Sequence, residues 1–370
     1  MRKLLKTVAF LALAAALAWV GVQYYQQKQA QANFYSRPPV KVAADGTSTS
    51  PAAHSKAAYK KLLAKTYPAI YDDAFKTPAL TKVGQNVVIP GLLATKSYDL
   101  TTGKLATSRD MTPQGLTVAG PYLLISAYDG AHKQTSVVYC LDKKTGRYLK
   151  TIRVAGRPHL GGLAYDPNFK NIWLTGENGD GSVLMSFSLK QLEKYKTKSN
   201  QLISYNNYIS LPTIERASAV TYFDRQLFVG YFNKYEKGRV ASYPIDSKGS
   251  IASDTIKAAG VQASWSDGSG SAAMDRQIQG IAFDQNLIFL SQSYGSGSSK
   301  LFIFPMSALN NLDEKNAQNV IELPPYLEQI YVCNGQLLML FESGARQYQR
   351  SDKMVMDRVL SVNINALLGN

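Results

Sequence analysis

From about residue 85 onward, short runs of apolar residues alternate with turn residues, and pairs of such runs recur along the chain. The five pairs are 114–118 with 122–126, 161–165 with 172–175, 218–222 with 226–230, 279–283 with 287–291, and 328–332 with 336–340. Their equivalent positions 115, 162, 219, 280 and 329 lie 47, 57, 61 and 49 residues apart. A period near 50 residues that is built from short strands is typical of a β-propeller, in which each period forms one sheet, or blade.

A third strand is predicted after each pair, over residues 136–141, 183–189, 239–245, 300–306 and 358–364. Three turns open with Asp and close with Gly: Asp99–Gly103, Asp142–Gly146 and Asp246–Gly249. In such turns the Asp side chain accepts a backbone hydrogen bond and Gly takes a positive φ. We expect each of the three turns to join the outer two strands of a blade.

The chain begins out of phase with its own repeats. Residues 85–112 contain outer-strand material before the first inner strand, and the last repeat ends at Ile364 without a fourth strand. N-terminal residues should therefore complete the blade that the C-terminus begins, which would remove two open sheet edges. The prediction is an all-β, five-bladed propeller, with six blades as the alternative if residues 85–112 hold further strands.

Four second-strand segments carry a resemblance to a known family. LLISAYD, IWLTGEN, LFVGYFN and IFLSQSY resemble the YVTN-type and quinoprotein-like propeller repeats of bacterial surface proteins, over roughly residues 85–367. The resemblance implies the architecture and leaves the activity open, because that superfamily includes enzymes, binders and scaffolds. No repeat spells YVTN, and we find no clear motif for a quinone or haem cofactor.

Residues 1–32 predict a signal peptide or a membrane anchor. Arg2, Lys3 and Lys6 precede sixteen uncharged residues, 7–22. A signal peptide would be cleaved after Ala30-Gln31-Ala32, whereas a retained anchor could place Tyr24 and Tyr25 at the membrane interface. Both alternatives put the propeller outside the cytoplasmic membrane, either secreted or tethered at the cell surface.

Between this segment and the propeller the composition changes twice. Residues 33–54 are rich in Pro, Ser, Thr and Ala, which predicts a disordered tether. Residues 55–84 form a predicted helical lead-in, in which apolar residues share one helix face until Pro68 ends the helix. The propeller domain is then expected to occupy residues 85–370.

The net charge of the chain indicates a class of binding partner, and its two cysteines bear on disulfide formation. Lys and Arg number 41 against 26 Asp and Glu, a net charge of +15, and four of the cations lie in the first 32 residues. This balance favours polyanions, namely anionic lipid, an anionic wall polymer or nucleic acid, of which export disfavours nucleic acid. Location and charge together favour an envelope glycan or an envelope protein as partner. The repeat phase puts Cys140 and Cys333 on different strands, so we expect buried thiols and no disulfide.

The loop that leads into each inner strand and the loop that leaves each second strand open on the same side of a propeller, around its channel. We call this side the channel face. Polar and aromatic residues on these loops predict a ligand-binding site formed by Gln114, Tyr128, Arg157, His159, Asn178, Arg216, Asn233, Trp265, Arg276, Gln279, Tyr294, Glu328 and Glu342. Trp265 would cap the channel or stack on a sugar ring, or else pack against a neighbouring blade.

No motif identifies a catalytic mechanism, so catalytic residues stay open, with His159, Glu177 and Asp129 as candidates. No metal or other cofactor is expected, although calcium would suit the carboxylates and amides of Glu177, Asn178, Asn233 and Asp129. The leading hypothesis is an exported cell-envelope propeller that binds a glycan or protein without catalysis. The alternative is a hydrolase or lyase that acts on a glycan or lactone with rim carboxylates and His159.

Overall fold

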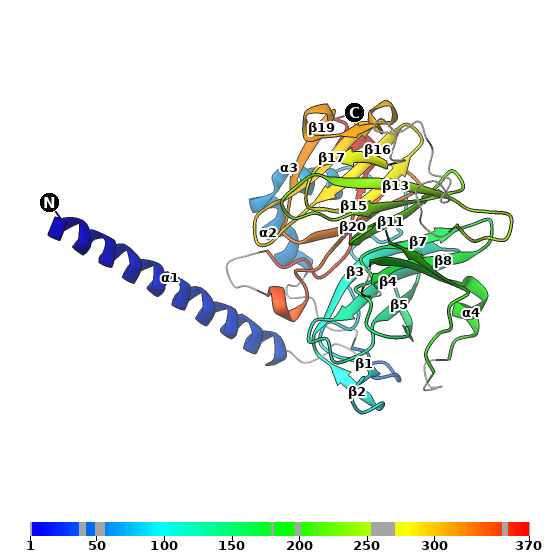
Figure 1. Cartoon of the computed structure of the whole chain (residues 1–370), viewed down its shortest axis with the longest axis horizontal. Coiled ribbons are helices and arrows are strands. Elements are labelled where there is room, and N and C mark those ends of the chain that lie inside the picture. Colours follow the sequence, from blue (N-terminus) through cyan, green and yellow to red (C-terminus); the bar gives the residue numbers. More distant parts are fainter. Residues whose placement is uncertain are drawn as a thin grey trace.

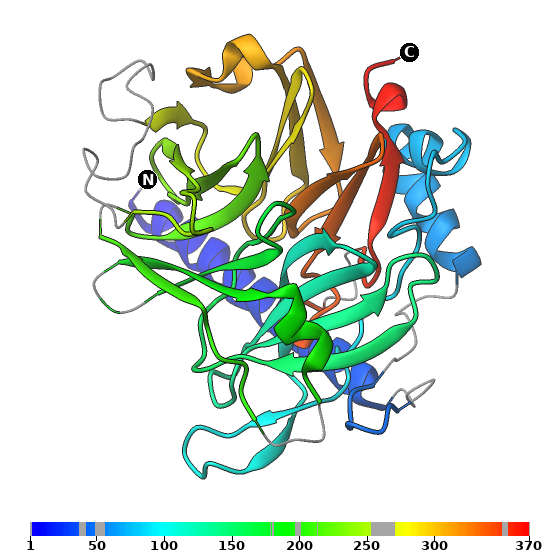
Figure 2. The ribbon, with the colours of Figure 1, turned by 90° about the vertical axis from the view of Figure 1, so that its right-hand side faces the viewer.

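The computed structural model describes residues 2–36, 42–48, 56–177, 179, 181–196, 201–212, 214–252, 271–349 and 354–369. Its sheets form a ring of five blades around a central channel (Figures 1 and 2), so the chain is a five-bladed β-propeller. Apart from one short parallel strand added at the edge of blade 3, the blades are antiparallel, and each runs from an inner strand at the channel to an outer strand at the rim.

The strands of each blade follow one another along the chain, apart from the short strand β18 of blade 3, which lies between two strands of blade 4 in sequence. Blade 1 contains β3 (Met111–Ala119), β4 (Tyr122–Asp129), β5 (Val137–Asp142) and β6 (Tyr148–Arg153). Blade 2 contains β7 (Leu163–Asp166), β8 (Asn171–Glu177), β9 (Ser182–Ser188) and β10 (Asn207–Leu211). Blade 3 contains β11 (Ala217–Phe223), β12 (Gln226–Tyr231), β13 (Gly238–Pro244) and β14 (Ser271–Met274), with β18 (Asn311–Leu312) added in parallel. Blade 4 contains β15 (Ile278–Asp284), β16 (Leu287–Gln292), β17 (Ser299–Pro305) and β19 (Asn319–Leu323). Blade 5 contains β20 (Leu327–Cys333), β21 (Gln336–Phe341) and β22 (Leu360–Asn363).

The α-helices lie outside this ring. They are α1 (Arg2–Ser36), α2 (Lys56–Thr66), α3 (Pro68–Phe75), α4 (Leu189–Lys194) and α5 (Ile364–Leu367). Three 3-10 turns lie in connections between strands: η1 (Met306–Ala308), η2 (Glu314–Asn316) and η3 (Arg346–Tyr348). Pro68 ends α2 as predicted and is also the first residue of α3, where its missing N–H costs no hydrogen bond. Tyr59, Leu63 and Ile70 anchor the helix pair on the apolar cluster between blades 4 and 5.

Five apolar clusters fill the five gaps between neighbouring blades. Each joins one face of a blade to the facing side of the next, for example Leu116 and Ile125 of blade 1 with Leu338 of blade 5. Both faces of the inner and second strands are therefore buried, and all nine residues of β3 are buried. Burying apolar surface on both faces of a sheet is the main stabilising term of this architecture.

Blade 5 is closed by the N-terminal side of the chain, as the phase of the repeats predicts. Val88 pairs antiparallel with Arg358, the amide of Ile89 donates to the Asp357 carbonyl at 3.0 Å, and the amide of Val359 donates to the Val87 carbonyl at 2.8 Å. The ring is therefore closed by two segments, around positions 88 and 358, that lie about 270 residues apart in sequence.

One predicted turn has a different role. Asp99–Gly103 joins β1 (Thr95–Tyr98) to β2 (Leu105–Ser108), which form a separate two-stranded hairpin and not the outer strands of a blade. This hairpin lies against the loop after β4, where Ser97 donates to the Thr135 carbonyl at 2.8 Å. The interpretation was wrong for this turn because the turn motif reports a local bend and not the sheet to which its strands belong. Asp142–Gly146 joins β5 to β6 as predicted.

Candidate functional site

A cavity of about 330 Å³ opens on the channel face and is lined by all five blades. It contains residues from loops far apart in the sequence, because each blade contributes the loop into its inner strand or the loop out of its second strand. The predicted residues that the structure places in its wall are Gln114, Tyr128, His159, Arg216, Gln279, Tyr294, Glu328 and Glu342. A larger hollow, of about 570 Å³, lies at the outer edge of the ring beside Val88 and Tyr148, away from these loops.

The other predicted ligand-binding residues lie outside the wall of this cavity or outside the described residues. Arg157 donates to the His132 carbonyl at 2.6 Å, and the Asn233 side chain accepts from the amides of Tyr235 and Glu236 in its own turn. Arg276 is exposed on the loop before β15. Asn178 and Trp265 lie outside the described residues, so their assignments stay predictions.

A pair of buried glutamates forms the acidic centre of the cavity. Glu328 is the second residue of β20, and Glu342 directly follows β21. Their side chains are hydrogen-bonded to each other. Burial raises the pKa of Glu328 well above the ordinary value, and the neighbouring Glu342 carboxylate raises it further. Burial also raises the pKa of Glu342, to about 8, against the opposing effect of its hydrogen bonds. Two carboxyl groups in contact cannot both be ionised at little cost, so the pair holds at least one proton at neutral pH.

Three neutral or cationic groups surround this pair. The Gln114 amide donates to Glu342 Oε2 at 2.8 Å, and the Tyr348 hydroxyl is hydrogen-bonded to the same carboxyl group. The Arg216 guanidinium lowers the pKa of both glutamates and lies 5.0 Å from the centre of the Phe232 ring. The cavity therefore combines a protonated acid pair, an amide and one cation, with little net negative charge.

Aromatic rings form much of the remaining wall. Tyr128 lies between two histidines, with ring centres 4.3 Å from His159 and 5.7 Å from His132. Tyr326 and Tyr348 pack with centres 4.8 Å apart, and Phe232 lies 6.3 Å from Tyr294 at the outer rim. Because rings present flat apolar surface and hydroxyls present polar edges, such a wall suits a ligand with both kinds of surface.

His159 is neutral across the physiological range. Burial, together with the positive charge of Arg216 and the nearby His132, lowers its pKa to about 3. Neither of the carboxylates considered as its partner contacts the imidazole through a described hydrogen bond. Glu177 accepts the His159 backbone amide at 3.1 Å, and Asp129 accepts from Ser108 and from the amides of Lys133 and Gln134. Both carboxylates thus hold loops in place in this structure.

Sequence reasoning missed several residues of the wall, chiefly Phe232, Tyr326 and Tyr348. Phe232 directly follows a second strand, so its repeat position could have indicated it. Tyr326 precedes β20 with φ +66°, which turns the backbone into the channel after two prolines. Tyr348 belongs to the long connection between β21 and β22, which has no counterpart in the other blades, and the repeat therefore gave no signal for it.

Among the described residues, no group of three His, Cys, Asp or Glu side chains converges as metal ligands. The expectation of calcium at Glu177, Asn178, Asn233 and Asp129 stays untested, since Asn178 is not described. Both cysteines are free thiols; Cys140 is buried, as expected, whereas Cys333 is only half-buried.

No protein-family model and no curated protein matches the chain. Among solved structures, the PQQ-bound form of an aldose sugar dehydrogenase from Streptomyces coelicolor is 15% identical, with a TM-score of 0.45, and the match covers 68% of this chain and 94% of that one. A chain of a nidogen–laminin complex is 10% identical, with a TM-score of 0.37 and coverage of 72% and 95%. An exo-beta-1,3-galactanase from Phanerochaete chrysosporium, with bound beta-1,3-galactotriose, is 9% identical, with a TM-score of 0.41 and coverage of 73% and 63%. These likenesses carry no conclusion about the ligand of this chain, and none assigns it to the YVTN type.

Proposed function

We propose that this protein is an exported, cell-envelope propeller that binds a carbohydrate at its channel face without chemically altering it. The observation that carries the proposal is the cavity of about 330 Å³ in which the Glu328–Glu342 pair, Gln114 and Arg216 lie beneath a wall of aromatic rings. Polar groups that converge in a concave, partly aromatic site on a rigid scaffold are typical of small-ligand recognition.

A carbohydrate fits this cavity better than a strongly charged ligand does. A sugar offers hydroxyl groups that both donate and accept hydrogen bonds, together with flat C–H faces that stack on aromatic rings. Protonated Glu328, the Gln114 amide and the Arg216 guanidinium supply donors, while Glu342 supplies an acceptor. Tyr294, whose side chain is 50% exposed at the rim, offers a ring face to an entering sugar.

The geometry of the acidic groups supports binding over hydrolysis. A glycosidase needs two carboxyl groups about 5–10 Å apart, on opposite sides of the scissile bond. Glu328 and Glu342 contact each other directly, which leaves no space between them for a glycosidic oxygen. With a pKa of about 3, His159 is also a very weak base and does not carry a proton to donate at neutral pH.

Export is supported by α1. Residues 6–29 of this helix are long and apolar enough to cross a membrane, with a mean hydropathy of 1.7. Phe10, Leu13 and Trp19 are each at least 60% exposed, so the propeller does not cover them. The basic residues before this stretch would stay on the cytoplasmic side and leave the propeller outside.

The proposal is tested by screening the full chain, in detergent micelles, against an array of neutral and acidic oligosaccharides. Affinity for the oligosaccharides that bind is then measured for Tyr294→Ala and for the matched control Tyr208→Ala. Tyr208 is 56% exposed but lies on β10, at the outer edge of blade 2. Loss of a stacking ring should weaken binding about 3- to 10-fold in Tyr294→Ala, and Tyr208→Ala should bind like the wild type.

Two results would overturn the proposal. The first is that no oligosaccharide binds, or that the two tyrosine variants behave alike. The second is release of new reducing ends from a bound oligosaccharide by the wild type and not by Glu342→Gln, which would establish the hydrolase alternative instead.

A further inference from the structure

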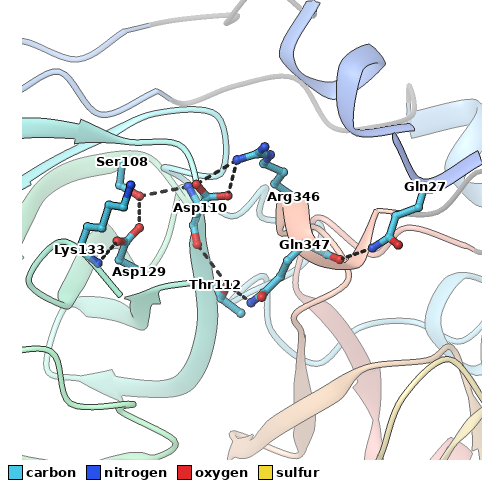
Figure 3. Close-up of polar contacts among 8 residues, drawn as sticks. All are labelled: Gln27, Ser108, Asp110, Thr112, Asp129, Lys133, Arg346 and Gln347. Atoms are coloured by element: carbon cyan, nitrogen blue, oxygen red, sulfur yellow. Dashed lines mark hydrogen bonds and ion pairs between the residues drawn. The ribbon is translucent and has the colours of Figure 1, made fainter. Parts of the chain in front are cut away.

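The helix α1 reaches the propeller next to the candidate binding cavity. The Gln27 side chain donates to the backbone carbonyl of Gln347 at 3.3 Å, and Gln347 belongs to η3 (Figure 3). The Gln347 side chain in turn donates to Thr112 Oγ1 at 2.8 Å and to the hydroxyl of Tyr128 at 3.2 Å. Tyr128 lines the cavity, as does Tyr348, the last residue of η3. The part of α1 around Gln27 therefore contacts the rim of the channel face.

The contacted rim is braced on blade 1. Arg346 of η3 forms an ion pair with Asp110, with N–O distances of 2.9 and 3.1 Å. The Asp110 amide donates to the Ser108 hydroxyl, which donates to the buried Asp129 carboxylate at 2.6 Å (Figure 3). Because these contacts join η3 to the loop before β3, the surface that meets α1 is a fixed part of the propeller.

The direction of α1 places this rim towards a membrane. Figure 1 shows α1 running away from the blades on the side opposite to α4, and in Figure 2 it lies behind the ring with α4 in front. The span Lys6–Gln29 has 24 residues. At about 1.5 Å per residue it is somewhat longer than the hydrocarbon layer of about 30 Å. Gln27, which contacts the propeller, lies near the C-terminal end of that span. The surface of a membrane crossed by α1 would therefore lie close to the channel face.

The channel face carries residues that suit an anionic bilayer surface. Its loops expose the cations Arg109, Lys133, Arg157 and Arg276. Tyr235, on the loop after β12, is 74% exposed, and Tyr294 is half-exposed. The Lys234 ammonium contacts both rings, at 4.9 Å from the centre of the Tyr235 ring and 4.8 Å from the centre of the Tyr294 ring. Tyrosines are enriched at membrane interfaces, and each Lys or Arg near an anionic surface adds about 1 kcal/mol of attraction.

We propose that the channel face docks onto the anionic outer surface of the membrane from which α1 emerges, so that the cavity opens at the headgroup layer. This inference rests on α1 being retained and not cleaved. Its consequence for the ligand rests on the carbohydrate proposal, because a bound sugar would then lie at the membrane surface. The opposite side of the ring, with α4 and the β5–β6 turn, faces away from the bilayer.

The test uses the full chain reconstituted into vesicles of phosphatidylglycerol with phosphatidylcholine, and into vesicles of phosphatidylcholine alone. Exposed lysines are acetylated briefly with a membrane-impermeant reagent, and peptides are quantified by mass spectrometry. Lys133 on the channel face is compared with the matched control Lys190 on α4, which is also exposed. We expect acetylation of Lys133 to fall at least about threefold in the anionic vesicles and to recover in high salt, because screening weakens the attraction. Lys190 should react equally in both vesicles.

A second measurement uses Tyr235→Cys and Lys190→Cys in a chain that also carries Cys140→Ala and Cys333→Ala. A dye on residue 235 should transfer energy to headgroup-labelled lipid more efficiently than a dye on residue 190. The double variant Arg109→Glu with Lys133→Glu should remove the difference between anionic and neutral vesicles.

Equal protection of Lys133 and Lys190, or equal energy transfer from both dyes, would overturn the docking proposal. Oligosaccharide affinity is measured in parallel in micelles, where no bilayer is present. If it persists while docking fails, only this inference is lost. If docking succeeds and no oligosaccharide binds, the carbohydrate proposal fails instead.

Discussion

At the scale of single residues, Gln329 joins the inner strands of several blades across the centre of the ring. Its position in the repeat is taken by Gly115, Gly162, Ala219 and Gly280 in the other blades. The Gln329 side chain accepts from the amides of Leu116 and Leu163 at 2.7 and 2.8 Å, and donates to the carbonyls of Leu163 and Val220 at 2.7 and 3.0 Å. One amide therefore satisfies backbone groups of blades 1, 2 and 3 from blade 5. The small residues at these positions let neighbouring inner strands approach closely, since a Cβ on Gly162 would lie 2.3 Å from the Val220 nitrogen.

We predict that Gln329→Ala lowers the free energy of unfolding by about 2–4 kcal/mol, because it leaves buried amides without partners. Urea unfolding followed by fluorescence measures the change. Gln285→Ala is the control, because Gln285 is exposed in the β15–β16 turn and should change stability by less than about 0.5 kcal/mol. Indistinguishable midpoints for the two variants would show that water replaces the Gln329 amide.

The acid pair predicts a pH dependence with a definite sign. Burial raises the pKa of Glu342 from 4.5 to about 8, so the folded state binds a proton that the unfolded state releases between these values. The contribution of this group to stability is therefore fully present below pH 4.5 and is lost as the pH rises through 8, by up to about 1.4 kcal/mol per pH unit. Thermal unfolding at several pH values should show this slope in the wild type and a smaller one in Glu342→Gln. A variant with the wild-type slope would place the responsible proton elsewhere.

His159 gives an independent prediction about the cavity. Because its pKa is lowered to about 3, its imidazole should remain neutral, with constant NMR shifts, from pH 8 down to pH 5. The resonance is assigned by comparison with His159→Asn. A chemical-shift transition near neutral pH would contradict the burial of this ring and would return His159 to the list of acid–base candidates.

At the scale of elements, the segment around Val88 completes blade 5 with only a short ladder. The amide of Ile89 is one of its two backbone bonds, and the Ile89 side chain is fully buried. Ile89→Ala removes packing alone, whereas Ile89→Pro also removes the donor and leaves the Asp357 carbonyl unpaired. We expect Ile89→Pro to be less stable than Ile89→Ala by about 1–3 kcal/mol in urea unfolding. Equal stabilities would mean that the N-terminal segment is held by its side chains and not by the ladder.

The elements also show what the sequence pattern can and cannot predict. Inner, second and third strands follow from the repeat because each must be buried on both faces, and all five third strands form close to the expected residues. The β1–β2 hairpin and the β21–β22 connection escape the pattern because their residues occur once. The cavity wall follows the same division: Gln114, Glu328 and Glu342 come from repeat positions, whereas Tyr348 comes from the unrepeated connection. The contact between Glu328 and Glu342 depends on how β20 and β21 of blade 5 are placed relative to each other, which a pattern of strands does not specify.

At the scale of the whole molecule, the ring and α1 are nearly independent folding units. The hydrogen bond that joins α1 to the ring at η3 runs from Gln27 to Gln347, whereas residues 42–48 are held by the ring itself through Thr47–Thr151 and Ser48–Ala94 hydrogen bonds. A chain that begins at residue 42 should therefore remain soluble and unfold in one cooperative transition, because the last blade closes the ring. Its melting temperature should lie within about 2 °C of that of the full chain in micelles, since a half-buried hydrogen bond such as Gln27–Gln347 contributes about 1 kcal/mol or less. Calorimetry decides the point: two transitions, or a large drop in melting temperature, would show that α1 stabilises the propeller and does more than position its channel face.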